Sequence, residues 1–459
     1  MGEVRNVAEP ATAAPPNRRT AFAEGVDKAR AAATTEPGRL RIIGAVLALL
    51  VVAFGAVTAW QTADRAAAAD DVLHKSQPLS AAAAEIYRSL ADANTAASSG
   101  FLAGGQETPT SRKQYEEDID KAAAELVRAA NSSDPDSPSA DAITKLNTLL
   151  PEYKGLVERA RTYNRQGFPV GGAYLRYANQ KMQDEMLPAA QQLYTKENQR
   201  LEDDYADATP YPWAAIALGV LALAALAWAQ HRNYRRTNRV LNHGLVSATA
   251  AATVVLLWLV VGHSVARAAL NDSYDHGVRS LNVLHDARIA SLKARGNENL
   301  TLVARGAETE KIAVDGGEPK TVDKYDNDFT TEMKDLATGL TQAAKLADDQ
   351  AGEKPVTSAE GNMAVWNQRH LAAREQDDNG NYEQALALVI GDKGATAECF
   401  DSVDKNLATA LKHEQKEFQA AAGDGLGAMT GLTAGAAVLA VLGAAGAVLG
   451  IGRRLSEYR

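Results

Sequence analysis

The sequence predicts an all-α membrane protein with four transmembrane helices and two extracytoplasmic four-helix bundles related by internal duplication. Three observations predict this fold: four uncharged apolar stretches, apolar residues that recur every three or four positions between them, and two long segments with the same order of short motifs. The average composition hides this pattern, because 459 residues with 46% apolar side chains and a net charge of −9 are typical of an acidic soluble protein.

The four stretches without Asp, Glu, Lys or Arg are predicted to cross the membrane, and they cover residues 42–60, 211–230, 244–264 and 426–451. A spanning helix needs roughly 17–25 apolar residues, which each stretch supplies. The first could also be a cleaved signal peptide, because Val57-Thr58-Ala59 resembles a cleavage site of small residues. Its apolar run is long for that role, and cleavage would leave Trp60 at the new terminus. We therefore predict an uncleaved anchor.

The distribution of Lys and Arg predicts the orientation, because basic residues are retained on the cytosolic side of a membrane. The N-terminal tail (1–41), the short loop 231–243 and the C-terminal end (452–459) each have more basic than acidic residues. Segment 61–210 has 16 basic and 23 acidic residues, and segment 267–426 has 18 and 28. We expect a multi-pass protein of the plasma membrane with both termini in the cytosol. The tail is rich in Ala and Pro without periodicity, so it is predicted to be disordered.

The two outer segments, 61–210 and 265–425, are each predicted to form a four-helix bundle. Ala-Asp-Ala-Asn at 91–94 and Tyr-Glu-Glu-Asp-Ile at 115–119 recur as Gly-Asn-Glu-Asn at 296–299 and Tyr-Asp-Asn-Asp-Phe at 325–329. Apolar residues at alternating spacings of three and four are typical of packed helices. They include Ile86, Leu90, Ala93 and Ala97 in the first segment and Phe329, Met333, Leu336 and Leu340 in the second. Breakers such as Gly316-Gly317-Glu318-Pro319 separate the helices.

No catalytic signature occurs in the chain. A phosphate-binding loop, a dinucleotide fingerprint, an HExxH motif and a kinase signature are all absent, so we expect no enzyme activity, no cofactor and no nucleic-acid partner. A single cysteine excludes a disulfide framework and a Cys-based zinc site, and Cys399 is predicted to be a buried core residue. His276 and His285 are nine residues apart and are expected on a solvated helix surface. We expect no metal site.

The inner loop carries a cluster of four arginines, Arg232, Arg235, Arg236 and Arg239, without any acidic residue. One interpretation is topology and attraction to anionic lipid, worth about 1 kcal/mol per charge. The other is a docking site for a cytosolic partner, because this loop is the connection between the two halves of the chain.

Small residues recur every four positions at the start of the fourth span, at Gly427, Gly431 and Gly435. Such a face lets two helices approach closely. It predicts either packing among the four spans of one chain or a homodimer through this face.

The order of span, four-helix bundle and span is similar to that of the ligand-sensing ectodomains of bacterial chemoreceptors and sensor kinases. The tandem version, with four spans, duplicated outer segments and an Arg-rich inner loop, resembles the GlnX-type transmembrane signalling proteins of actinobacteria. This resemblance covers nearly the whole chain as architecture, and it transfers no ligand residue. It implies a link between a periplasmic amino-acid-binding lipoprotein and a cytosolic Ser/Thr protein kinase.

We therefore expect a transmembrane signal transducer, which relays an extracytoplasmic amino-acid signal from a solute-binding lipoprotein to a cytosolic Ser/Thr protein kinase. The inner segments are too small to hold an enzyme, so the signal needs a cytosolic partner. The alternative is a structural scaffold of the cell envelope with self-associating bundles. A third hypothesis is direct sensing of a small carboxylate ligand by cationic groups on the bundle faces, such as Arg88 or Arg295.

Overall fold

The computed structural model describes residues 35–104, 107, 109–133, 135–237, 242–313, 319–391 and 393–455. It confirms the all-α fold, and in this part of the chain four helices are long and apolar enough to cross a membrane. The chain divides into two compact units. The membrane unit comprises the residues up to Gln61, Pro212–Val261 and the residues from Gly431 onward. The bundle unit comprises Thr62–Tyr211 and Gly262–Thr430.

The membrane unit is built from α2 (Glu36–Asp71), α8 (Trp213–Thr237), α9 (His243–Asp272) and α15 (Leu432–Leu455), of which α2 and α9 end in the bundle unit. Helix α2 begins before the predicted span, within the tail 1–41 that was expected to be disordered. Pro37 lies in its first turn, where the missing N–H costs no helical hydrogen bond. Residues 1–34 lie outside the described part of the chain. Helix α8 also continues into the predicted inner loop 231–243.

The predicted fourth span, 426–451, contains a break between two helices. Helix α14 (Thr396–Met429) ends at Thr430, which is extended with ψ 133°, and Gly431 follows with φ +77°. A positive φ is readily adopted by glycine because it has no Cβ. Helix α15 therefore starts afresh at Leu432, so the predicted span 426–451 is interrupted near its beginning.

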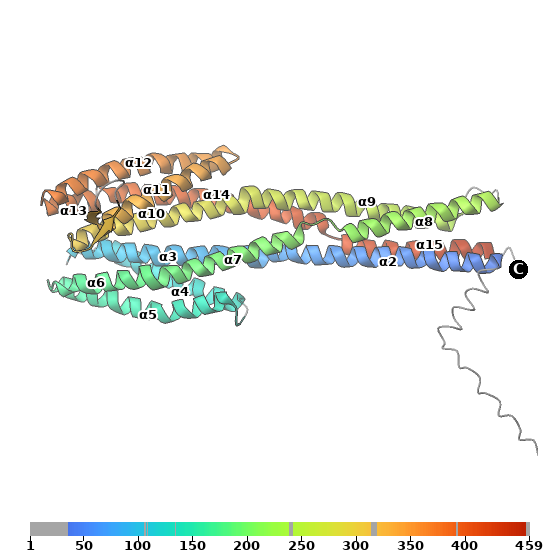
Figure 1. Ribbon diagram of the computed structural model, residues 1–459, viewed down its shortest axis with the longest axis horizontal. Coiled ribbons are helices and arrows are strands. Elements are labelled where there is room, and N and C mark those ends of the chain that lie inside the picture. Colours follow the sequence, from blue (N-terminus) through green and yellow to red (C-terminus); the bar gives the residue numbers. More distant parts are fainter. Residues whose placement is uncertain are drawn as a thin grey trace, which may run out of the picture. The chain divides into compact units, whose positions relative to one another are not determined.

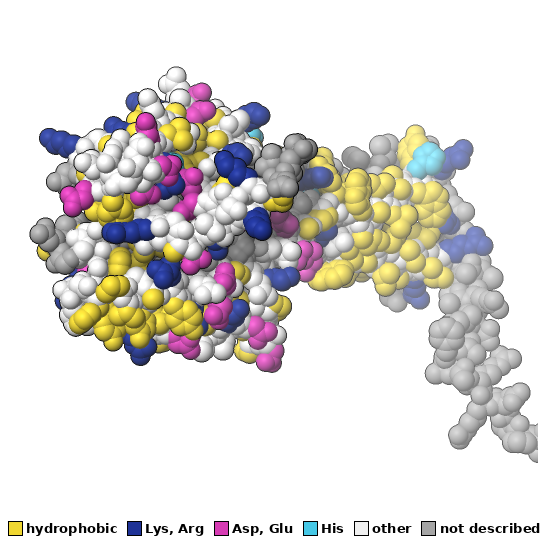
Figure 2. Space-filling model, turned by 60° about the vertical axis from the view of Figure 1, so that its left-hand side comes forward, with side chains coloured by type: hydrophobic (Ala, Val, Ile, Leu, Met, Phe, Trp, Pro, Cys, Tyr) yellow, Lys and Arg dark blue, Asp and Glu magenta, His cyan; other side chains and the backbone are white. Residues whose placement is uncertain are grey.

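Apolar side chains cover the surface of the membrane unit, whereas charged side chains lie over the bundle unit (Figure 2). Leu49 and Leu449 are each 68% exposed in the membrane unit. Exposed leucines at this density fit a surface that faces lipid rather than water. The inside of the unit is formed by residues such as Leu47, Phe54, Leu226 and Val255.

The first half of the bundle unit contains four long helical segments. They are α3 (Gln77–Leu102), α4 (Pro109–Ser132), α5 (Pro138–Arg165), and α6 (Val170–Lys181) with α7 (Leu187–Ala208). Two π-helical turns, η1 (Val72–Ser76) and η3 (Met182–Met186), join α2 to α3 and α6 to α7. The predicted apolar positions of this half are buried, and α5 passes through Pro151 without ending.

The second half has the same order of helices: α10 (Arg279–Ala304), α11 (Lys324–Leu346), α12 (Gln350–Asp378), and α13 (Tyr382–Ile390) with α14. The π-helical turn η4 (Ser273–Val278) joins α9 to α10. An antiparallel pair of strands, β1 (Thr309–Ile312) and β2 (Lys320–Asp323), was not predicted from the sequence. The two strands flank the predicted breaker 316–319, of which residues 316–318 lie outside the described part of the chain. The internal duplication stays a prediction.

The helices α3 and α10 lie side by side where the two halves of the bundle unit meet (Figure 1). One continuous cluster of buried apolar side chains extends through both halves. The two bundles are therefore packed against each other, with α3 and α10 at the centre of their contact.

Candidate functional site

The contact between α3 and α10, called here the seam, is made by small and polar side chains. Thr95 Oγ1 donates a hydrogen bond to the Leu292 carbonyl oxygen at 3.2 Å, and Asn299 Nδ2 donates to Ser99 Oγ at 2.7 Å. A Cβ placed on Gly296 would lie 3.4 Å from Thr95 Oγ1. Small residues permit this close approach, and directional hydrogen bonds specify the register of one helix against the other.

Further hydrogen bonds join the last helix of the first bundle to the start of the second. Tyr194 OH on α7 donates to Asn282 Oδ1 on α10 at 3.0 Å. Tyr205 OH lies 2.6 Å from Ser273 Oγ at the start of η4. The contact between bundles is thus polar along α7 as well as along α3.

A buried arginine on α3 forms ion pairs with three carboxylates of the first bundle. Arg88 contacts Glu85 at 2.8 Å, Asp92 at 3.1 Å and Asp118 at 3.6 Å. Burial, together with the charge of nearby Asp92, raises the pKa of Asp118 to about 7. Burial also raises the pKa of Asp92. One arginine therefore does not suffice to keep both aspartates ionised near neutral pH.

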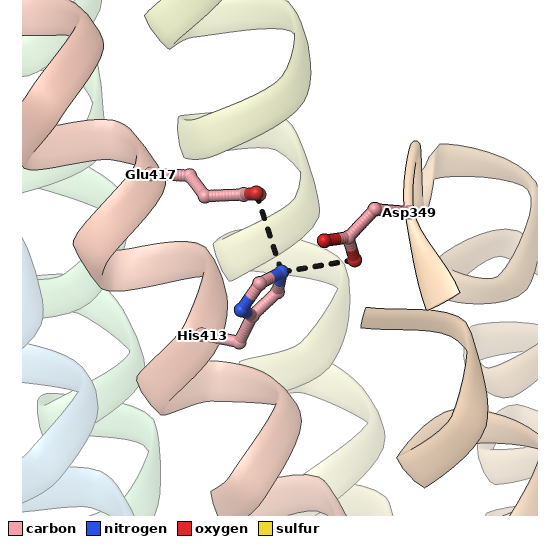
Figure 3. A group of neighbouring side chains, drawn as sticks. All are labelled: Asp349, His413 and Glu417. Atoms are coloured by element: carbon pink, nitrogen blue, oxygen red, sulfur yellow. Dashed lines mark hydrogen bonds and ion pairs between the residues drawn. The ribbon is translucent and has the colours of Figure 1, made fainter. Parts of the chain in front are cut away.

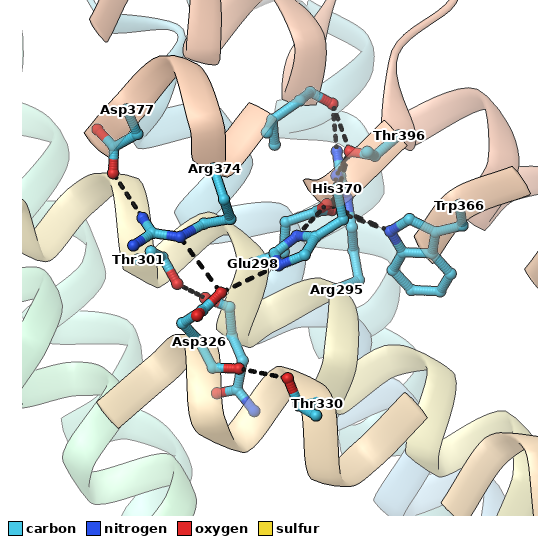
Figure 4. Close-up of polar contacts among 12 residues, drawn as sticks. Arg295, Glu298, Thr301, Asp326, Thr330, Trp366, His370, Arg374, Asp377 and Thr396 are labelled. Atoms are coloured by element: carbon cyan, nitrogen blue, oxygen red, sulfur yellow. Dashed lines mark hydrogen bonds and ion pairs between the residues drawn. The ribbon is translucent and has the colours of Figure 1, made fainter. Parts of the chain in front are cut away.

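A second charged cluster surrounds Glu298 on α10, inside the second bundle (Figure 4). Its carboxylate accepts hydrogen bonds from Arg295 at 2.6 Å, from Thr396 at 2.9 Å and from the Trp366 indole at 3.2 Å. His370 Nδ1 lies 3.0 Å from the other carboxylate oxygen. Glu298 is only 1% exposed, so every one of these partners compensates a charge removed from water.

His370 connects Glu298 to a second carboxylate. Its Nε2 lies 3.1 Å from Asp326 Oδ1, and Arg374 Nε lies 3.3 Å from the same oxygen. Burial alone would lower the pKa of His370, but the hydrogen bonds to Asp326 and Glu298 outweigh it and raise that pKa. Burial would raise the pKa of Glu298, yet its bonds from His370 and Arg295 hold it below its ordinary value. The imidazolium and both carboxylates thus stabilise one another's charged forms.

A cleft of about 520 Å³ opens between the bundles, lined by α6 on one side and α10 and α11 on the other. Its charged lining combines both signs: the cations Arg176, Lys293 and Lys324 and the anions Asp184, Glu308, Asp328 and Glu332. Lys293 Nζ lies 3.4 Å from Glu332 Oε1. The volume is within the range of small-molecule sites, and a lining of mixed charge suits a small dipolar solute.

The hypothesis that Arg88 or Arg295 offers a free cationic group on a bundle face is wrong. Arg88 is 7% exposed and Arg295 is 3% exposed, and both are paired with carboxylates of the chain itself. His285 was expected on a solvated surface, but burial lowers its pKa to about 4, and its ring packs against Tyr194. Cys399 is buried, as predicted.

Helix α8 holds three arginines of the predicted basic cluster near its end. The guanidinium of Arg232 lies 5.7 Å from the ring centre of Trp228, and Arg235 is exposed. Arg236 belongs to the helix, but its side chain and all of Arg239 lie outside the described residues. The structure therefore places Arg232, Arg235 and Arg236 on one helix end and leaves the role of the cluster a prediction.

Of the three glycines of the predicted face, Gly435 packs closely against another helix of this chain, whereas Gly427 and Gly431 do not. A Cβ added to Gly427 or Gly431 would meet no atom within 4 Å, whereas one on Gly435 would overlap the Trp258 ring on α9. Helices of the membrane unit also approach closely at Gly244 and Gly450: a Cβ added to Gly244 would lie 2.5 Å from the Gly450 Cα, and one added to Gly450 would lie 3.0 Å from the Gly244 Cα. A homodimer through Gly427 and Gly431 stays a prediction.

Sequence reasoning missed Glu298 and His370 as partners. Glu298 was noticed only as a member of the repeated motif 296–299. The sequence did contain an indication of this cluster. Trp366 and His370 are four residues apart and therefore project from the same face of α12. Two polar aromatic residues on a buried face require a hydrogen-bond acceptor.

Comparison with known proteins identifies one relationship. Residues 68–206 match the family model described as "Actinobacterial sensor domain". This segment contains α3 to α7 almost completely, which is the first bundle. No curated protein and no solved structure matches the chain. The protein is therefore a membrane protein whose first bundle is similar to an actinobacterial sensor domain, which supports a sensor protein of actinobacteria.

Proposed function

We propose that this protein is a transmembrane signal transducer, which relays an extracytoplasmic amino-acid signal to a cytosolic Ser/Thr protein kinase. A solute-binding lipoprotein would carry the amino acid and dock on the bundles. The observation that carries this proposal is the similarity of residues 68–206 to a sensor domain. In the plasma membrane, both termini and the loop after α8 would face the cytosol.

The continuity of the helices supplies a route for the signal. One helix extends over Pro37–Leu102 and another over His243–Ala304, and each contains a candidate span followed by α3 or α10. These are the two helices that form the seam. A shift of about 1–2 Å in their register is typical of helix movements in signalling proteins. The turns η1 and η4 interrupt both helices with π-helical geometry, which is frequent at functional sites.

The arginines near the end of α8 are proposed to transmit the signal by binding the cytosolic kinase. Anionic lipid attracts Arg232, Arg235, Arg236 and Arg239, and a cytosolic kinase would compete for the same side chains when the spans shift. Such a switch requires that the ligand-loaded lipoprotein bind the two registers of the seam with different affinities.

Affinity purification of the full chain from native membranes after cross-linking tests the proposal. We expect a solute-binding lipoprotein and a regulatory Ser/Thr kinase among the recovered proteins. A variant with the four arginines changed to Gln is expected to lose the kinase and keep the lipoprotein. Recovery of neither partner, with cell-wall or division proteins instead, would favour a structural scaffold.

The cleft between the bundles favours a second candidate, direct binding of an amino acid. Its cationic and anionic side chains could pair with the two charges of a zwitterion. Calorimetry of the full chain in nanodiscs against single amino acids tests this route. Heat that disappears in Lys324→Met and Asp328→Asn would support direct binding, and no heat with any amino acid would leave the lipoprotein as the carrier of the signal.

A further inference from the structure

Three side chains that could ligate a cation converge on one point of the second bundle (Figure 3). His413 and Glu417 are one turn apart on α14, and Asp349 precedes α12. His413 Nε2 lies 3.0 Å from Asp349 Oδ1 and 3.2 Å from Glu417 Oε1. One ligand atom from each residue lies within 4.8 Å of the others. The three atoms thus form a compact triangle.

The surroundings of this triangle are negatively charged. Asp348 and Asp349 precede α12, and Glu414 and Glu417 lie on α14. Glu414, the neighbour of His413, is only 3% exposed. Four carboxyl groups therefore meet at the junction of α12 with α14, which favours a bound cation.

We propose that Asp349, His413 and Glu417 bind a first-row divalent transition-metal ion, with Zn²⁺ as the reference ion. An imidazole nitrogen and two carboxylate oxygens are the donor set that such ions accept. Tetrahedral zinc with bonds of about 2.1 Å places neighbouring ligand atoms about 3.4 Å apart. The separations of His413 Nε2 from the Asp349 and Glu417 oxygens, 3.0 and 3.2 Å, are close to this value. Three protein ligands leave the fourth position to water.

The protein orients Asp349 before an ion arrives. Asp349 Oδ1 accepts the Gly352 N–H at 2.8 Å, which fixes the carboxylate at the start of α12. Phe418, next to Glu417, is fully buried against Gly277 of η4. A hydrogen bond to a metal ligand, such as that from Gly352 N–H to Asp349, usually supports metal affinity. A bound ion would tie the start of α12 to α14 beside η4.

Zinc binding by the full chain, purified in detergent without a histidine tag, tests the proposal. Competition with a chromogenic chelator should give one zinc per chain, and His413→Gln and Glu417→Gln should each weaken binding by at least about tenfold. With Co²⁺ as a probe, the visible absorption of a tetrahedral site with nitrogen and oxygen ligands is expected only in the unaltered chain.

The pair His74 and Asp70 supplies the matched control, because its ring nitrogen and carboxylate are also 3.0 Å apart but no third ligand adjoins them among the described residues. His74→Gln should leave zinc affinity unchanged. Circular dichroism of each variant checks that it is folded. The proposal is overturned if the chain binds no zinc, or if His413→Gln and Glu417→Gln bind it as tightly as His74→Gln does.

Discussion

The carboxylate of Glu298 on α10 and the imidazole of His370 on α12 are joined by a buried hydrogen bond of 3.0 Å. Helix α10 also forms the seam with α3, through Asn299 and Thr95. The cluster around Glu298 therefore joins α10, the seam helix, to α12 and α14 of the same bundle. A rigid second bundle is what a sensor needs if the register of the seam is to carry a signal.

Glu298→Gln is expected to destabilise the second bundle by about 3–5 kcal/mol, because it leaves the buried charges of Arg295 and His370 without their shared partner. Thermal unfolding of the full chain in detergent measures this loss. Glu398→Gln is the matched control, since Glu398 contacts Arg369 at the surface of the same bundle. A loss as small as that of Glu398→Gln would contradict a stabilising role for the cluster.

The stability of the second bundle should depend on the protonation of His370. Its folded-state pKa is raised above the ordinary histidine value, so its contribution is complete below about pH 6.5. That contribution is lost as the pH rises through the raised pKa. His370→Gln should abolish this decline, which unfolding midpoints between pH 6 and 9 would reveal. An unchanged pH profile in His370→Gln would show that another group is responsible.

Asp118 should also make the first bundle less stable as the pH rises, because its ionised form is the costly one in the folded chain. Its pKa is about 7 in the folded chain, whereas an unfolded aspartate ionises near pH 4. Folding therefore takes up a proton in this interval, and stability falls as the pH rises from about 4 to 7. We expect Asp118→Asn to gain stability relative to the unaltered chain over this range and to keep a constant advantage above it. Denaturant unfolding at several pH values measures the difference, and an advantage independent of pH would disprove the assignment.

Substitution of Gly244 tests how closely the helices of the membrane unit pack. A Cβ there would overlap backbone atoms of Gly450 on α15, which cannot rotate away. Gly244→Ala should cost about 1–3 kcal/mol through overpacking. Gly423→Ala, where a Cβ meets nothing within 4 Å, should instead gain up to about 1 kcal/mol in helix stability. Unfolding midpoints in detergent distinguish the two, and equal effects would contradict the close contact of α9 with α15.

Periodicity and charge predicted the helical fold, because both are local properties of the sequence. The apolar positions Ile86, Leu90 and Leu336 are buried as their spacing indicated. The break at Gly431 was missed, since a glycine within an apolar run is compatible with a continuous helix until its φ is known. The strands β1 and β2 were missed because four-residue segments carry too little periodicity.

The site could be predicted only in part, because its members are distant in the sequence. Asp326 and His370 meet through the packing of α11 against α12, which composition does not reveal. Arg295 was singled out by its charge, yet its role as the partner of Glu298 depends on burial. The triangle of Asp349, His413 and Glu417 likewise joins two segments, and only the spacing of His413 and Glu417 is visible in the sequence.

A reversible cross-link across the seam tests most directly whether the signal passes between α3 and α10. The pair Thr95→Cys and Gly296→Cys suits this purpose, because a Cβ at residue 296 lies 3.4 Å from Thr95 Oγ1. Cys399→Ala removes the native thiol. The pair Ala347→Cys and Gly352→Cys is the control within one bundle, where the Cβ atoms would be 3.5 Å apart. The phosphorylation response of the recovered kinase to amino acid is the readout. We predict that oxidation of the seam pair abolishes the response, that a reductant restores it, and that the control pair leaves it intact. A full response from the oxidised seam pair would contradict signalling through this contact.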